Sequence, residues 1–117
     1  MGDRANVKVV YRDRAVYLYT HWRGLELPGQ VRDTLRDHRN IWTDDVYLAG
    51  QIFRAMCDGR PSQDSLGISA RLDDGTRRVI VVDTKACMVW FERDGDPVTD
   101  PVPFKDFAAL KGEVYWP

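Results

Sequence analysis

The chain has 117 residues, of which 44% are hydrophobic and 30% charged, and this suits one globular domain over residues 1–117. Its 17 basic and 18 acidic residues give a net charge of −1, which argues against general nucleic-acid binding because such proteins usually carry a basic excess. The start has no apolar signal segment, and no apolar run approaches the ~20 residues that span a membrane.

The two cysteines, Cys57 and Cys87, lack the Cys-x-x-Cys and Cys/His spacings of zinc sites. We therefore expect reduced thiols and a cytoplasmic protein that has no metal, no cofactor and no membrane contact.

The first two expected elements are strands over residues 6–12 and 15–22, rich in β-branched and aromatic residues and joined by a turn at Asp13-Arg14. A two-residue turn fixes the register of a hairpin. The predicted cross-strand pairs are Val10 with Tyr17, Lys8 with Tyr19, and Asn6 with His21.

Alternation along these strands predicts two different faces. One face is mostly apolar, and we expect helices to cover it; it carries Val7, Val9, Tyr11, Val16, Leu18, Thr20 and Trp22. The other face is mixed and carries Asn6, Lys8, Tyr17, Tyr19 and His21.

Two helices are expected next. Residues 27–40 have Pro28 in the first turn, where proline is favoured. Residues 43–59 begin with Thr43 or Asp44 as the N-cap, and Gly50 within them suggests close packing. The predicted core stripe of this second helix is Val46, Ala49, Ile52, Phe53 and Met56.

The remaining chain predicts a meander of strands at 66–72, 77–83 and 86–92, a loop at 93–103, and a short helix at 104–111. The element order is then ββααβββα. This order predicts an α+β fold with a five-stranded, mainly antiparallel sheet, two helices packed on one face, and a short C-terminal helix.

The expected turn at Asp74-Gly75 would place Arg71 directly opposite Arg78. Like charges at such positions destabilise a sheet. Either the two arginines are solvated and splayed apart, or a neighbouring acid, a partner chain or a bound anion offsets their repulsion.

A metal-dependent phosphodiester hydrolase is the enzymatic alternative, because Asp83-x-Lys85 follows a strand and acidic residues at Asp73 and Asp74 precede it. The two acidic groups lie at opposite ends of a strand of about six residues, roughly 20 Å apart at ~3.3 Å per residue. One metal cannot bridge that distance, so the hydrolase is less favoured than the two binding functions described below.

The mixed face of the hairpin needs a cover: a second subunit, a ligand or solvent. Tyrosine and tryptophan are enriched at interfaces, and aromatic rings with arginine and histidine donors also recognise a nucleobase and a phosphate. Both a homodimer interface and a ligand pocket therefore remain open.

Three segments, "VYLYTHWRG", "DDVYLAGQIFRAM" and "LGISARLDDG…VIVVD", make the chain resemble a family of small uncharacterised phage and bacterial proteins. The resemblance covers residues 5 to 92. It indicates which residue positions the family shares, but it implies no activity. These positions are Tyr19, His21, Trp22, Gly24, Tyr47, Leu48, Gly67 and Ser69. Phage proteins of this size often counter host defence, so the resemblance suggests sequestration of a nucleotide immune signal.

Together these observations predict a non-catalytic protein, a homodimer, that binds an anionic, nucleotide-like ligand. The predicted ligand-binding residues are Tyr17, Tyr19, His21, Trp22, Arg23, Arg71 and Arg78. The alternative is an inhibitor or adaptor that binds a host protein through the same surface.

Overall fold

The computed structural model describes residues 2–58, 65–72 and 76–117. Its strands are β1 (Ala5–Tyr11), β2 (Arg14–Thr20), β3 (Leu66–Ser69), β4 (Arg78–Asp83), β5 (Met88–Arg93), β6 (Asp96–Pro97) and β7 (Val102–Pro103). Its α-helices are α1 (Leu27–Asp37), α2 (Asp45–Cys57) and α3 (Phe104–Ala108). Two short 3-10 turns, η1 (Gly24–Glu26) and η2 (Arg39–Ile41), precede α1 and α2.

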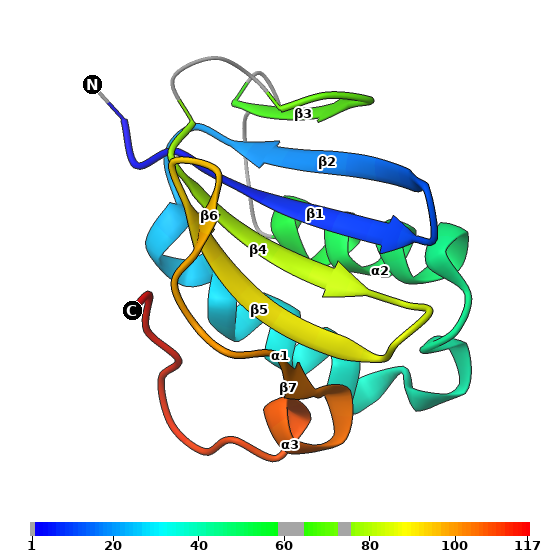
Figure 1. Cartoon of the computed structure of the whole chain (residues 1–117). Helices are drawn as coiled ribbons and strands as arrows, with labels where there is room; N and C mark the ends of the chain where they lie inside the picture. Colours follow the sequence, from blue (N-terminus) through cyan, green and yellow to red (C-terminus); the bar gives the residue numbers. More distant parts are fainter. Residues whose placement is uncertain (1, 59–64, 73–75) are drawn as a thin grey trace.

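The strands form one sheet in the order β3-β2-β1-β4-β5-β6, with β7 also paired to β5. The helices lie together on one side of this sheet (Figure 1). The α+β class is confirmed. The predicted order with five strands is wrong, because residues of the expected 93–103 loop form two further short strands, β6 and β7.

The β1–β2 hairpin forms as expected, but its turn lies at Arg12-Asp13, because Tyr11 pairs with Arg14. Arg12 has φ 57°, in the left-handed region that two-residue hairpin turns use. Lys8 consequently pairs with Tyr17, and the three predicted pairs are wrong by two residues. The predicted faces hold within β1 and β2, because a shift of two residues returns each side chain to the same face.

The predicted meander is wrong at its first turn. β3 pairs with β2 at the sheet edge, whereas β4 pairs in parallel with β1, so two strands separate β3 from β4. Residues 79–82 of β4 are at most 3% exposed, and this continuous apolar run suits a central strand beside a parallel neighbour. The expected Asp74-Gly75 turn falls outside the described residues.

Arg71 and Arg78 therefore do not face each other. Arg78 pairs with Arg93 on β5, and Arg71 follows the end of β3 at the far edge. The like-charge pair predicted from the sequence is wrong, because it depended on a β3–β4 hairpin that does not form.

The core lies between the sheet and the helices. Asp44 caps α2, and its Oδ1 accepts a hydrogen bond from the Tyr47 N–H at 3.1 Å, so Asp44 is the N-cap of the two predicted candidates, Thr43 and Asp44. α1 and α3 end before the predicted ends at residues 40 and 111. The sheet and helix core is formed by Val7, Val9, Leu18, Ile80, Val82, Val31, Leu35, Leu48, Ile52 and Phe104, among others.

The predicted core stripe of α2 needs two corrections. Leu48 belongs to it, whereas Val46 is 65% exposed. The close packing expected at Gly50 is also wrong, because a Cβ there would meet no atom of the described residues within 4 Å, apart from its own helix backbone and chain neighbours. A glycine inside a helix costs about 1 kcal/mol relative to alanine. Packing within the described chain does not explain why residue 50 is glycine.

Candidate functional site

The side of the sheet turned away from the helices is the candidate site, and we call it the open face. In the described parts of the chain, no helix lies on this side (Figure 1). Strand alternation and register assign its members. They are Asn6, Lys8 and Val10 on β1, Ala15, Tyr17 and Tyr19 on β2, Gly67 and Ser69 on β3, Val79, Val81 and Asp83 on β4, and Met88, Trp90 and Glu92 on β5.

Lys8 occupies the middle of the open face. Its neighbours across the sheet are Tyr17 on β2 and Val81 on β4, and Trp90 follows on β5. The Lys8 Nζ lies 5.7 Å from the centre of the Tyr17 ring, within the range of a cation–π contact. Among the described residues, no carboxylate forms an ion pair with this ammonium group.

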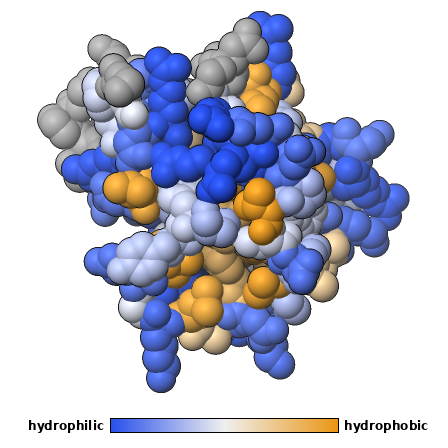
Figure 2. Space-filling view, turned by 60° about the vertical axis from the view of Figure 1, so that its left-hand side comes forward, coloured by the Kyte–Doolittle hydropathy of each residue, from blue (hydrophilic) through white to orange (hydrophobic). Residues whose placement is uncertain are grey.

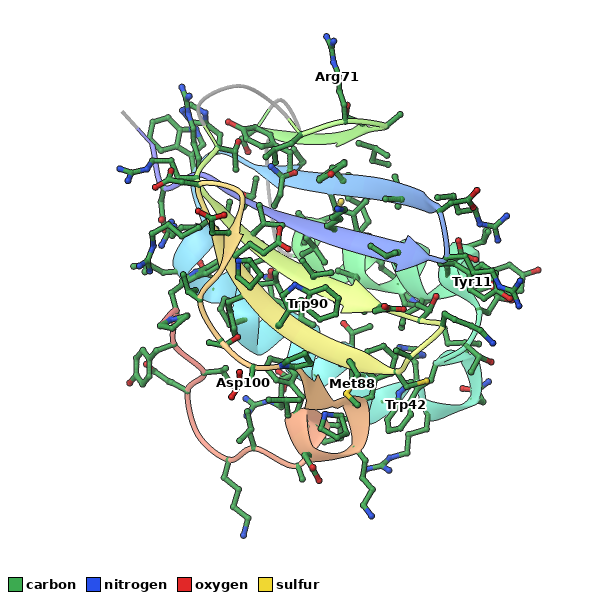
Figure 3. The ribbon with its side chains drawn as sticks, viewed as in Figure 1. Tyr11, Trp42, Arg71, Met88, Trp90 and Asp100 are labelled. Atoms are coloured by element: carbon green, nitrogen blue, oxygen red, sulfur yellow. The ribbon has the colours of Figure 1, made fainter. Side chains whose placement is uncertain are left out.

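Trp90 extends over the open face from β5 (Figure 3). Its Nε1–H donates a hydrogen bond to Glu92 Oε2 at 3.0 Å, which orients the indole ring. Val79 and Val81 on the same face are 3% and 1% exposed, so larger neighbours cover them. The open face is therefore a layer of aromatic and polar side chains over a short apolar floor.

Asn6 lies on this floor between Tyr19 and Val79 and is only 1% exposed. Its Nδ2 has no hydrogen-bond partner among the described residues. Burial of an unpaired amide is costly, so the centre of the open face is not optimised for stability alone.

His21 and Trp22 stand at the rim of the open face. The Tyr19 hydroxyl and His21 Nδ1 share a hydrogen bond of 3.0 Å, and the His21 and Trp22 rings meet edge-on with centroids 4.5 Å apart. The expectation that Trp22 belongs to the core is wrong, since it is 58% exposed. β2 ends at Thr20, so strand alternation no longer governs residues 21 and 22.

Arg78 points to the other side of the sheet. It precedes Val79, which is on the open face, and therefore shares the helix side with Ile80. Its guanidinium donates to Asp3 Oδ1 and lies 4.9 Å from the centre of the Trp116 ring. Through these contacts, Arg78 packs the two ends of the chain together. It lies on the opposite side of the sheet from Tyr17.

Two other predicted arginines also lie away from the open face. Arg23 is exposed and forms an ion pair with Glu26 at 3.4 Å. Arg71 projects away from the sheet beyond β3, and its backbone N–H donates to Ser69 Oγ at 3.1 Å (Figure 3). The structure thus brings together Tyr17, Tyr19 and His21, but it does not add Arg71 or Arg78 to them.

Sequence reasoning missed two members of the site. Trp90 alternates with the buried residues Val89 and Phe91, and this alternation could have assigned it to the outer face. Lys8 belongs to the mixed face that the sequence predicts, but it is not among the predicted binding residues. Its central position follows from the parallel β1–β4 pairing, which the sequence did not indicate.

Asp83 and Lys85 occupy a turn. Asp83 Oδ1 accepts the backbone N–H groups of Lys85 and Ala86 at 3.0 and 3.1 Å, a local arrangement typical of aspartate in turns. Asp73 and Asp74 lie outside the described residues. Within the described ranges, no group of three or more histidine, cysteine, aspartate or glutamate residues could hold a metal ion.

Burial, together with the charge of Asp83, raises the pKa of the Cys87 thiol, which favours its protonated form. Both Cys57 and Cys87 are free thiols. Within the described residues, no helix has the length and apolar character needed to cross a membrane.

A hollow of about 390 Å³ lies between the start of α1 and the C-terminal tail. Arg32 at its base is 9% exposed and donates to the carbonyl oxygens of Leu110 and Gly112 at 2.6 and 2.9 Å. On the side that carries both termini, Figure 2 shows small hydrophobic patches divided by hydrophilic residues. Arg32 thus holds the tail in place, and we assign this hollow a structural role.

No protein-family model, curated protein or solved structure matches the chain. The resemblance to phage and bacterial proteins therefore stays a prediction. The functional argument depends on the geometry of the open face.

Proposed function

We propose that the protein is a non-catalytic binding protein that holds an anionic, nucleotide-like ligand on the open face. The observation that carries the proposal is the position of Lys8. Its ammonium group lies in the middle of the sheet, over the Tyr17 ring, without a carboxylate ion pair among the described residues. A phosphate group would supply the missing negative charge.

The aromatic residues suit the planar part of such a ligand. A base stacked on an aromatic side chain contributes about 1–3 kcal/mol to binding. Tyr17 and Trp90 flank Lys8 from β2 and β5, three strand spacings apart, or about 14 Å at ~4.8 Å per spacing. This separation fits two planar groups joined by a phosphate-containing linker, so we propose a dinucleotide in preference to a mononucleotide.

The Tyr19–His21 hydrogen bond provides a polar rim for the same ligand. His21 can donate to a phosphate or a base edge through its other ring nitrogen. The resemblance to phage proteins extends the proposal to sequestration of a nucleotide signal of host defence. The biological setting thus rests on the resemblance, and the binding chemistry rests on Lys8 and its aromatic neighbours.

Calorimetry and thermal shift with mononucleotides, linear dinucleotides and cyclic dinucleotides test this proposal. A ligand that binds only the folded state raises the melting temperature by mass action. Lys8→Gln should weaken binding by about tenfold or more, the equivalent of one lost charged hydrogen bond. Lys105→Gln on α3 is the matched control and should leave binding unchanged.

Tryptophan fluorescence locates the ligand. Binding should quench the emission, and Trp90→Phe should remove most of this quenching, while Trp42→Phe, on the helix side of the sheet, should retain it. If no nucleotide shifts the melting temperature, or if Lys8→Gln binds as the wild type does, the proposal is wrong. Capture of a host protein without nucleotide binding would favour the inhibitor or adaptor alternative.

A further inference from the structure

Trp90 and Glu92 form a pair at the β5 end of the open face. They are two residues apart on one strand, so their side chains lie on the same side of the sheet. The Trp90 Nε1–H donates to Glu92 Oε2 at 3.0 Å, and because this N–H lies in the plane of the indole, the carboxylate is held at the edge of the ring. A planar group stacked on Trp90 would therefore have the carboxylate next to its own edge.

The carboxylate of Glu92 keeps most of its acceptor capacity. A carboxylate offers about four acceptor positions, and the indole occupies one of them. Among the described residues, no lysine, arginine or histidine forms an ion pair with Glu92. Arg77, just before β4, is bound instead to Asp94, through both carboxylate oxygens at 2.7 and 2.8 Å. The unused positions beside Trp90 are thus suited to a ligand that donates hydrogen bonds.

Lys8 carries the opposite charge on the same face. Val81 pairs with both Lys8 and Trp90, so Trp90 is level with Lys8, two strand spacings away. Glu92 lies two residues further along β5, which places its Cα roughly 12 Å from that of Lys8, at ~4.8 Å per strand and ~3.3 Å per residue. The open face thus has a site for an anion at Lys8, a stacking ring at Trp90 and a site for hydrogen-bond donors at Glu92.

We infer that this end of the open face recognises guanine. The inference rests on the proposed function and specifies the base that Trp90 stacks. Guanine presents two adjacent donors, N1–H and the 2-amino group, and a carboxylate accepts such a pair through both of its oxygens. Adenine, cytosine and uracil each place an acceptor beside their donor, and that acceptor would face the negative charge of Glu92. The phosphate of the same nucleotide then extends toward Lys8.

The Tyr17 end of the open face has no matching carboxylate in the described strands. Tyr17 pairs with Lys8 and Ser69 on the neighbouring strands, and Ala15 and Tyr19 are its neighbours on the same face of β2. Tyr17 therefore provides a stacking surface without an acidic side chain beside it. One guanine in a dinucleotide meets the requirement at Glu92, and the second base is free to vary.

Calorimetric titration of the full-length protein with the linear dinucleotides GpG, GpA, ApG and ApA tests the inference. A good bidentate contact discriminates against the wrong base by about tenfold to a hundredfold, and GpG should bind more tightly than ApA by this factor. The tighter of GpA and ApG should approach GpG. Hypoxanthine in place of guanine lacks the 2-amino donor and should lower the affinity by about tenfold, the equivalent of one charged hydrogen bond.

Glu92→Gln separates recognition of the base from support of the Trp90 ring. Glutamine retains an oxygen acceptor for the indole N–H, but it replaces the negative charge and one acceptor oxygen with an NH₂ donor. The variant should therefore lose the preference for GpG while it binds ApA at least as well as the wild type does, and this retained binding shows that the variant is folded. Glu113→Gln, at an exposed position in the C-terminal tail, is the matched control and should retain the preference.

Two results would overturn the inference while the proposed function stands. The first is binding of all four dinucleotides with equal affinity, or tighter binding of ApA. The second is an equal loss of affinity for GpG and ApA in Glu92→Gln, because Glu92 would then act only by orienting Trp90. Absence of binding to every dinucleotide would contradict the proposed function itself, and the inference with it.

Discussion

Asp3 and Arg78 join the N-terminal segment to the beginning of β4. Asp3 Oδ1 accepts a hydrogen bond from Arg78 Nη2, while Oδ2 accepts the Leu25 N–H at 2.8 Å. The Asp3 backbone adds hydrogen bonds to His21 and Gly24, at 2.7 and 2.8 Å. Asp3 thereby fixes the turn that follows β2, and with it the rim of the open face.

Asp3→Ala should therefore lower the free energy of unfolding. The substitution leaves the partly buried Arg78 guanidinium and the Leu25 N–H without this acceptor, which should cost about 1–3 kcal/mol. Urea denaturation measures the change. Asp100→Ala, at an exposed position, is the matched control and should stay within about 0.5 kcal/mol of the wild type. Equal effects of the two substitutions would contradict this role for Asp3.

Gly24 and Gly29 should respond to alanine in opposite directions. A Cβ at Gly24 would stand 2.6 Å from the Asp3 carbonyl oxygen and 2.7 Å from Arg78 Nη2. A Cβ at Gly29 would meet nothing within 4 Å in the described part of the chain, apart from its own helix backbone and chain neighbours. Gly24→Ala should therefore destabilise the fold by roughly 1–3 kcal/mol, as overpacking does. Gly29→Ala, inside α1, should stabilise it by about 0.5–1 kcal/mol. Chemical denaturation of both variants checks the signs, and a stable Gly24→Ala protein would contradict the tight packing.

The ion pair between Arg14 and Asp45 should make stability depend on acidic pH. Hydrogen bonds from Arg14, at 2.8 and 2.9 Å, are the main cause that lowers the pKa of Asp45. Because the folded-state pKa is depressed, this stabilisation is complete above the unfolded value of about 3.9 and is lost as the pH falls through the folded-state pKa. Melting temperatures measured below pH 5 should thus fall less steeply for Asp45→Asn than for the wild type. Arg14→Gln should reduce the slope in the same way, and parallel profiles for all three proteins would contradict the prediction.

Local features of the fold could be predicted from the sequence. Strand alternation assigns Tyr17 and Tyr19 to one face and Leu18 to the other, because this period depends only on the chain itself. The preference for aspartate and threonine before a helix limits the N-cap to Thr43 or Asp44, and Asp44 is the cap. These assignments hold even though the hairpin turn lies one residue earlier than expected.

The order of the strands in the sheet could not be predicted from the sequence. The Asp74-Gly75 dipeptide favours a hairpin, and this local preference led to the incorrect neighbours for β3 and β4. The observed sheet places the apolar strand β4 at its centre, parallel to β1, where it buries both faces. Burial of the whole strand outweighs the preference of one turn. The observed order places Trp90 two strands from Lys8, on the same face, and Arg71 beyond the opposite edge of the sheet.

Substitution of Asn6 tests whether the protein is less stable with this residue on the open face than with an apolar one. Its amide is 1% exposed, and Nδ2 has no hydrogen-bond partner among the described residues. Asn6→Val removes this buried donor and places a β-branched residue in a central strand, so it should raise the free energy of unfolding by about 1–3 kcal/mol. Asn40→Val, at an exposed position in η2, should change stability by less than about 0.5 kcal/mol. Denaturation of both variants in urea decides the matter, because a destabilised Asn6→Val protein would mean that the amide is satisfied in the folded state.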